Sequence, residues 1–149
     1  MQSQKRVKDE VALGALLRVA GNTYATAMRD ALAAEGFDDL PRDGVFFLGA
    51  IRGANTSLSD VIRWLGSSKQ SVGQLVDTLV LRGYVHRDVD EQDRRRLKIT
   101  LTERGEQVAA IARRVTRSID EKLLQAVGAA HVDCTRATLK ALMAQSEPK

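Results

Sequence analysis

The sequence has few of the residues that build disulfide-bonded or metal-binding proteins. Its 149 residues include one cysteine, Cys134, and two histidines, His86 and His131. A single cysteine cannot form a disulfide within the chain, and we expect a structural role for this thiol rather than a redox role. The histidines have no further ligands at metal-binding spacing, so we expect neither a metal site nor another cofactor.

Long apolar runs are also missing. The N-terminal segment MQSQKRVKDE contains no apolar stretch of the kind found in signal peptides, and no run approaches the roughly eighteen apolar residues of a membrane span. The readable segments contain no Ser-His-Asp, Cys-His or paired-carboxylate arrangement. We therefore expect a cytoplasmic protein that has no membrane partner and is not an enzyme.

What the chain does have is an Arg-Arg-Arg run between two short strand patterns. The net charge is only +4, so the position of this run matters more than the total charge. Apolar and polar residues alternate over 85–89 and again over 97–101, which predicts two strands flanking a basic loop at 90–96. Adjacent guanidinium groups must stay solvated or meet an anion, and the phosphates and the narrow minor groove of DNA are suitable.

Just before these strands the sequence predicts two helices joined by a tight turn. Apolar periodicity supports helices over 58–65 and 68–81, with only a Gly-Ser pair between them. Ser59 can cap the first helix and Ser68 the second, each hydroxyl accepting a hydrogen bond from a first-turn amide. Two short helices followed by a hairpin are typical of a winged helix-turn-helix that reads DNA.

The second of these helices has a polar face rich in long hydrogen-bond donors. Glutamine in particular can bond an adenine edge in two places. The residues that we expect to contact DNA are Ser68, Lys69, Gln70, Ser71 and Gln74 on this helix and Arg94, Arg95 and Arg96 in the loop. Gly73 lies on the same face and costs the helix about 1 kcal/mol relative to alanine. Either close approach to a partner or tight packing on a neighbouring helix is expected there.

A spaced motif runs through the loop and the second strand. Asp93 and Arg95 form an Asp-x-Arg that is followed, after five residues, by Leu101 and Thr102 and shortly afterwards by Gly105. This motif, together with the Leu-Gly-x-Ser turn and the helix SSKQSVGQLVDTLVLRGYV, resembles the multiple antibiotic resistance regulator (MarR) family of winged helix-turn-helix transcription factors. The resemblance implies that the arginine of Asp-x-Arg enters the minor groove while the aspartate organises the wing.

Four more helices are expected outside this region. Apolar residues recur at three- and four-residue steps over 13–32, a helix that Gly36 should terminate. Pro41 should open a second helix, whose expected apolar positions are Val45, Phe46, Leu48 and Ile51. Two further helices follow the strands, and Thr102 can cap the first of them. The predicted fold is thus mainly α, with six helices and one small β-hairpin wing.

The terminal helices would expose apolar stripes in an isolated chain. We therefore expect them to pair with a second copy of the chain, since such stripes are normally covered. The family resemblance implies the same two-fold homodimer. Residues 1–40 and 106–149 are assigned to dimerisation and residues 41–105 to DNA binding, all within one compact subunit.

The resemblance also implies a pocket for a small aromatic or anionic effector, because family members commonly bind such molecules between the dimer region and the DNA reader. The second helix departs from the opening that is usual in the family and reads LPRDGVFFLGAI instead. The residues expected near the pocket are Tyr24, Arg42, Phe46, Phe47 and Arg52.

We interpret the sequence as that of a sequence-specific transcription regulator that binds a palindromic operator in double-stranded DNA. Repression is favoured over activation, because a dimer that occupies a promoter blocks polymerase without any further contact. Two alternatives stay open. One is a DNA-architectural protein of low specificity. The other is a winged-helix protein-interaction module, in which the arginine run would be no more than a solvated loop.

Overall fold

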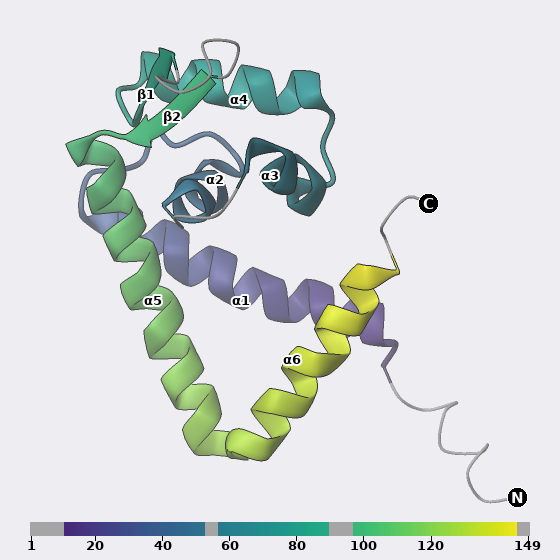
Figure 1. The fold of residues 1–149 in the computed structure, drawn as a ribbon. Helices are drawn as coiled ribbons and strands as arrows, with labels where there is room; N and C mark the ends of the chain where they lie inside the picture. Colours follow the sequence, from purple (N-terminus) through teal and green to yellow (C-terminus); the bar gives the residue numbers. More distant parts are fainter. Residues whose placement is uncertain (1–10, 53–56, 90–96, 146–149) are drawn as a thin grey trace, which may run out of the picture. The chain divides into compact units, whose positions relative to one another are not determined.

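The computed structural model describes residues 11–52, 57–89 and 97–145. The chain forms two compact units, Met1–Val115 and Thr116–Lys149. The elements in chain order are α1 (Leu13–Ala34), α2 (Gly44–Ile51), α3 (Leu58–Leu65), α4 (Lys69–Leu81), β1 (Val85–Val89), β2 (Leu97–Leu101), α5 (Glu103–Val127) and α6 (Ala129–Ala144). The predicted set of six helices and one hairpin is confirmed in the described residues (Figure 1).

Gly36 ends α1, as its position in the sequence predicts. Its φ is 81°, in the left-handed region that favours glycine. This conformation turns the chain back on the helix, so that the Phe37 amide donates to the Leu32 carbonyl at 2.9 Å. The polar groups at the end of α1 are thereby paired, and the chain is directed toward α2.

The prediction that α2 opens at Pro41 is wrong, because the helix begins at Gly44. Asp43 directly before it has a φ of 65°, and an α-helix of L-residues cannot pass through a left-handed residue. The Gly44 amide donates to the Pro41 carbonyl at 2.9 Å, which closes a turn. Pro41 therefore shapes the turn before the helix instead of forming its first residue.

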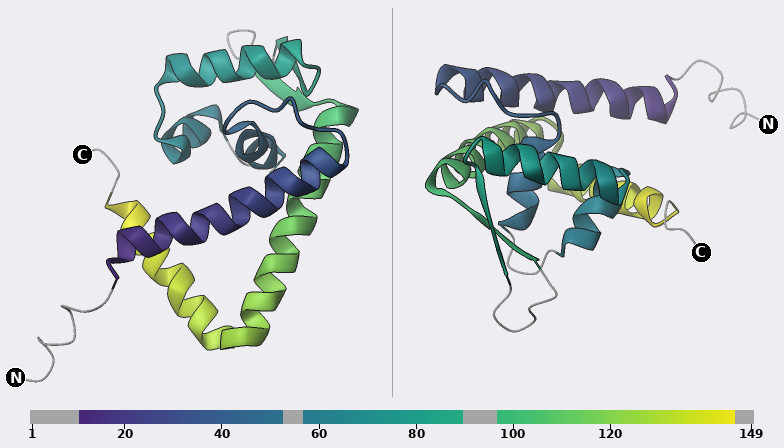
Figure 2. Two further views of the ribbon diagram at one scale, coloured as in Figure 1. Left: turned by 180° about the vertical axis from the view of Figure 1, so that it is seen from behind. Right: turned by 90° about the horizontal axis from the view of Figure 1, so that it is seen from above.

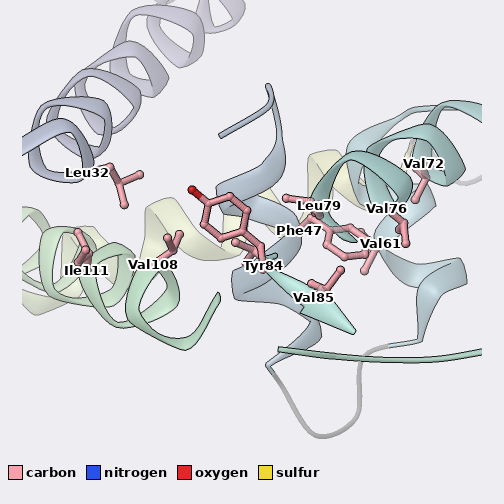
Figure 3. Packing of buried hydrophobic residues seen from close by; sticks show 11 residues of the cluster. Leu32, Phe47, Val61, Val72, Val76, Leu79, Tyr84, Val85, Val108 and Ile111 are labelled. Carbon is pink, nitrogen blue, oxygen red and sulfur yellow. The ribbon is translucent and has the colours of Figure 1, made fainter. Parts of the chain in front are cut away.

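The hydrophobic core of the first unit joins the helix-turn-helix to α1 and to the start of α5. Figure 3 shows Tyr84 between Leu32, Val108 and Ile111 on one side and helix-turn-helix residues on the other. Within α2, Phe47 is fully buried, whereas Phe46, which was expected to face the core, is 48% exposed. The buried cluster consists of Leu32, Phe47, Leu48, Val61, Val72, Val76, Leu79, Tyr84, Val85, Val108 and Ile111.

The predicted hairpin is confirmed as an antiparallel pair. Val85 lies opposite Leu101 and Val89 opposite Leu97, so the two strands flank residues 90–96 as expected. Val85 is buried and Leu101 is half-buried, which places one face of the hairpin against the core. In the right-hand view of Figure 2 the hairpin projects away from α4.

Each unit leaves rows of apolar side chains exposed. In the first unit they lie at the start of α1 and are Val11, Leu13, Leu16 and Val19. In the second unit they lie on α5 and α6 and are Leu123, Leu124, Val127, Leu142 and Met143. Such rows indicate a surface that a partner covers. None of the helices in the described ranges is both long and apolar enough to cross a membrane.

Candidate nucleic-acid interface

The second helix of the helix-turn-helix, α4, begins with a serine cap. The Ser68 side chain accepts a hydrogen bond from the Ser71 amide at 3.1 Å, and the two hydroxyl oxygens lie 2.9 Å apart. The cap predicted at Ser68 is therefore confirmed. The first turn carries no acidic residue, so the positive end of the helix dipole is not neutralised there, which suits an approaching phosphate.

The polar face of α4 presents its donors to solvent. Lys69, Gln70, Ser71 and Gln74 are all exposed, while Val72, Val76 and Leu79 anchor the opposite face in the core. Gln70 and Gln74 are four residues apart and therefore project from the same side of the helix. The structure thus brings the predicted helix residues together on one accessible surface, which we call the donor face (Lys69, Gln70, Ser71 and Gln74).

The first helix, α3, is capped by a residue that the sequence prediction missed. Ser57, not Ser59, is the N-cap: its hydroxyl accepts from the Asp60 amide, and its own amide donates to the Asp60 carboxylate, both at 3.1 Å. The prediction of Ser59 is therefore wrong. Hydrogen bonds from the Ser57 hydroxyl and amide lower the pKa of Asp60. Gly66, at φ 58°, ends α3 and makes the turn into α4.

An ion pair joins β1 to α4. Arg87 Nη2 lies 2.7 Å from Asp77 Oδ1, and so links the first strand of the hairpin to α4. The Asp77 side chain is mostly exposed, so the pair contributes little to stability. The pair shows that the first strand of the hairpin lies beside α4, where the buried Tyr84 and Val85 hold it. The predicted wing-tip residues, Asp93, Arg94, Arg95 and Arg96, lie outside the described residues.

The base of the hairpin explains the Leu-Thr-x-x-Gly part of the sequence motif. The Thr102 amide donates to the Tyr84 carbonyl at 3.0 Å, and the Thr102 hydroxyl donates to the Gly83 carbonyl at 2.6 Å. The same hydroxyl accepts from the Gly105 amide at 3.1 Å, which confirms that Thr102 caps α5. A Cβ on Gly105 would lie 2.2 Å from the Tyr84 carbonyl oxygen, so only glycine fits there.

Three polar residues from distant segments meet beside this base. The Tyr84 hydroxyl donates to the Asp39 carboxylate, and Arg104 Nη2 donates to the same carboxylate at 2.8 Å and to the Tyr84 hydroxyl at 2.9 Å. The guanidinium also lies 4.6 Å from the centroid of the Tyr84 ring. This group, which we call the Asp39 cluster, ties the segment before α2 to β1 and to the start of α5. The sequence analysis did not identify it.

The cluster holds its members in fixed ionisation states. The hydrogen bond from Tyr84 and the charge of Arg104 lower the pKa of Asp39, although desolvation acts against them. Burial, followed by the hydrogen bond to Asp39, raises the pKa of Tyr84. At neutral pH the carboxylate is therefore charged and the phenol neutral, which is the state in which the hydroxyl can donate.

We expect this network to make the protein sensitive to acid. A carboxyl whose pKa is lowered by folding stabilises the folded state above its ordinary pKa of 3.8, and the stabilisation is lost as the pH falls through the lowered value. Urea unfolding of the native protein and of Asp39→Asn should thus differ by a constant free energy at neutral and mildly acidic pH, and the difference should shrink below 3.8. A difference that keeps its full size throughout the acid range would contradict this assignment.

The residues predicted for an effector pocket lie in different surroundings. Phe47 is buried in the core, while Arg42 and Phe46 are exposed. Tyr24 is half-buried on α1. Arg52 pairs with Glu106 of α5 at 2.8 Å. A shallow hollow is present elsewhere, and the residues that line it are Gly36, Phe37, Glu103, Arg104 and Gln107.

No group of three potential metal-ligating side chains gathers within the ranges that the structure describes.

The donor face, the hairpin and the cap of α5 define a winged helix-turn-helix protein. A model of the MarR family matches residues 39–96, which include this region up to the end of the wing loop. Over these residues the chain is similar to the MarR family.

Solved structures share the fold along nearly the whole chain. CouR from Rhodococcus jostii RHA1, bound to p-coumaroyl-CoA, is 25% identical, with a TM-score of 0.71 over 92% of this chain and 93% of that chain. FabT from Streptococcus pneumoniae, in complex with DNA, is 20% identical, with a TM-score of 0.71 over 94% of each chain. MepR from S. aureus, also in complex with DNA, is 21% identical, with a TM-score of 0.69 over 91% of this chain and 99% of that chain. No curated protein sequence matches at a comparable level.

Proposed function

We propose that the chain is a homodimeric, sequence-specific DNA-binding transcription regulator that acts as a repressor. The observation that carries the proposal is the donor face of α4, which is accessible and lies beside the hairpin, as the contact between Arg87 and Asp77 shows. An α-helix of this kind fits the major groove, where its first turns reach base edges while the wing reaches the backbone or the minor groove. FabT and MepR, which share the fold, were solved with DNA.

Dimerisation is supported by the exposed apolar rows. α1 and the start of α5 contribute Leu32, Val108 and Ile111 to the core of the first unit, so the residues available to a partner copy are those that remain exposed. We keep the assignment of 1–40 and 106–149 to dimerisation and of 41–105 to DNA binding. Two readers related by a two-fold axis would bind a palindromic operator with half-site centres about 10 bp apart.

A small-molecule effector is the second part of the proposal. CouR was solved with p-coumaroyl-CoA, an aromatic and anionic molecule, which supports a ligand of that chemistry for a protein of this fold. We retain Tyr24, Arg42, Phe46 and Arg52 as candidate pocket residues, and Phe47 as one that would have to leave the core to take part. Such a regulator performs no catalysis, and its site of action is the cytoplasm, where its DNA target lies.

The donor face is tested by comparing its two kinds of side chain. Gln70→Ala and Gln74→Ala should each lose about 1–3 kcal/mol of binding at one base position and relax discrimination between duplex variants. Lys69→Ala should weaken binding to all duplexes alike and reduce the salt slope by about one unit, because it removes a phosphate contact. Affinities are measured on a duplex that the unmodified protein selects from a random pool.

Exposed residues outside the donor face and the hairpin provide the controls. Gln125→Ala and Lys140→Ala remove the same side chains from α5 and α6, and each should leave DNA affinity unchanged as long as sedimentation shows that the variant is still a dimer. If the Gln70 and Gln74 variants lose equal affinity for the selected and for random duplexes, the protein is the low-specificity architectural alternative. If no duplex is selected at all, the interaction-module alternative is favoured.

A further inference from the structure

Gly73 lies in the middle of α4, and no contact among the described residues requires a glycine there. Its φ is not in the left-handed region, so its conformation is open to any L-residue. A Cβ built on it meets none of the described residues within 4 Å, apart from its own helical surroundings. The alternative that Gly73 serves tight packing on a neighbouring helix is therefore wrong. Glycine inside a helix still lowers its stability relative to alanine, so a requirement from outside the chain is indicated.

The position of Gly73 on α4 indicates that the requirement for a glycine comes from a partner that binds the donor face. It follows Lys69 by four residues and Gln70 by three, and it directly precedes Gln74, so it lies at the edge of the donor face. An α-helix with its side chains is about 10–12 Å across and the major groove about 12 Å wide, which leaves almost no free space at the helix surface. A missing side chain at this edge lets the helix backbone come closer to the DNA.

We propose that Gly73 sets the depth of α4 in the major groove, so that the backbone of the helix contacts the DNA at this residue and Gln70 and Gln74 reach the base edges. The inference rests on the proposed function, since it concerns the same interface. Gly73 is a positioning residue, because it acts through the two glutamines. A larger side chain there should lift the whole helix and weaken every base contact at once.

The test is a pair of alanine variants that separates stability from binding. Gly49 is a matched control: it also lies within a helix, α2, is exposed, and has nothing within 4 Å of a Cβ built on it. Gly73→Ala and Gly49→Ala should both raise the melting temperature, by about 2–4 °C. Only Gly73→Ala should weaken binding to the selected duplex, by about tenfold or more, and Gly73→Leu should weaken it further.

A double-mutant cycle shows whether Gly73 acts through the glutamines. If it does, Gln74→Ala should cost much less affinity in the Gly73→Ala background than in the native protein, because the contact is already lost. Gly73→Ala that keeps native affinity, or that dissociates the dimer, would overturn the proposal while the native protein still binds DNA. If the native protein selects no duplex, the proposed function fails as well, so the two failures are distinguishable.

Discussion

Replacing Gly105 by alanine should destabilise the protein by about 3 kcal/mol or more, and lower its melting temperature by about 6–12 °C. The added Cβ would lie 2.2 Å from the Tyr84 carbonyl oxygen, which is backbone and cannot rotate away. Either the start of α5 or the chain at Tyr84 must move. Movement of either breaks the hydrogen bond from the Thr102 amide to that carbonyl and loosens the base of the wing.

Thermal unfolding followed by circular dichroism measures this effect. The control is Gly49→Ala, in which the same methyl group enters open space and should stabilise its helix slightly. Because the wing is part of the proposed DNA interface, any Gly105→Ala protein that remains folded at low temperature should also bind the selected duplex more weakly. A melting temperature within a degree or two of the native value would show that the base of the wing is not held as described.

The second large effect is expected at Tyr84, whose ring and hydroxyl have separate roles. Tyr84→Ala should cost about 3–5 kcal/mol, because it empties a fully buried position between α1, α5 and the helix-turn-helix. Tyr84→Phe keeps the ring and removes only the hydroxyl that donates to Asp39 and accepts from Arg104, so about 1–2 kcal/mol is expected.

Urea unfolding of the two variants separates these contributions. Asp39→Asn provides the control, because it weakens the same network without touching the ring. The losses of Tyr84→Phe and Asp39→Asn should not add fully in the double variant, since Tyr84→Phe removes and Asp39→Asn weakens the same hydrogen bond. Full additivity, or a Tyr84→Phe protein as unstable as Tyr84→Ala, would contradict the contact between these side chains.

The local parts of the fold were predictable from the sequence because their causes are local. The bounds of α3, the cap at Ser68 and the left-handed Gly36 follow from residue types within a few positions of one another. Strand alternation likewise predicted the hairpin, because its two strands lie close together in the sequence. The cap of α3 was misplaced to Ser59 because both serines are able to cap a helix. Ser57 is the cap because its amide and hydroxyl form a capping box with Asp60.

Contacts between distant segments could not be predicted in this way. α2 has the sequence GVFFLGAI, which is apolar on every side, so periodicity cannot tell that Phe47 is buried and Phe46 exposed. The Asp39 cluster joins three segments that the sequence keeps far apart, and nothing in the surroundings of Asp39 marks it as a partner of Tyr84. For the candidate site, the exposure of the donor face followed from helical spacing. The effector residues rested on resemblance alone, and they stay a prediction.

The shared core also determines when this protein can become functional during synthesis. Leu32 and Phe47 leave the ribosome long before Val108 and Ile111, with which they form the core. Asp39 likewise emerges long before Arg104, which donates a hydrogen bond to its carboxylate. At ordinary rates of translation this delay amounts to several seconds, during which a nascent helix-turn-helix lacks the residues that close its core. The DNA reader is therefore completed only as α5 emerges, and a truncated chain released before that point would not bind an operator in competition with the finished protein.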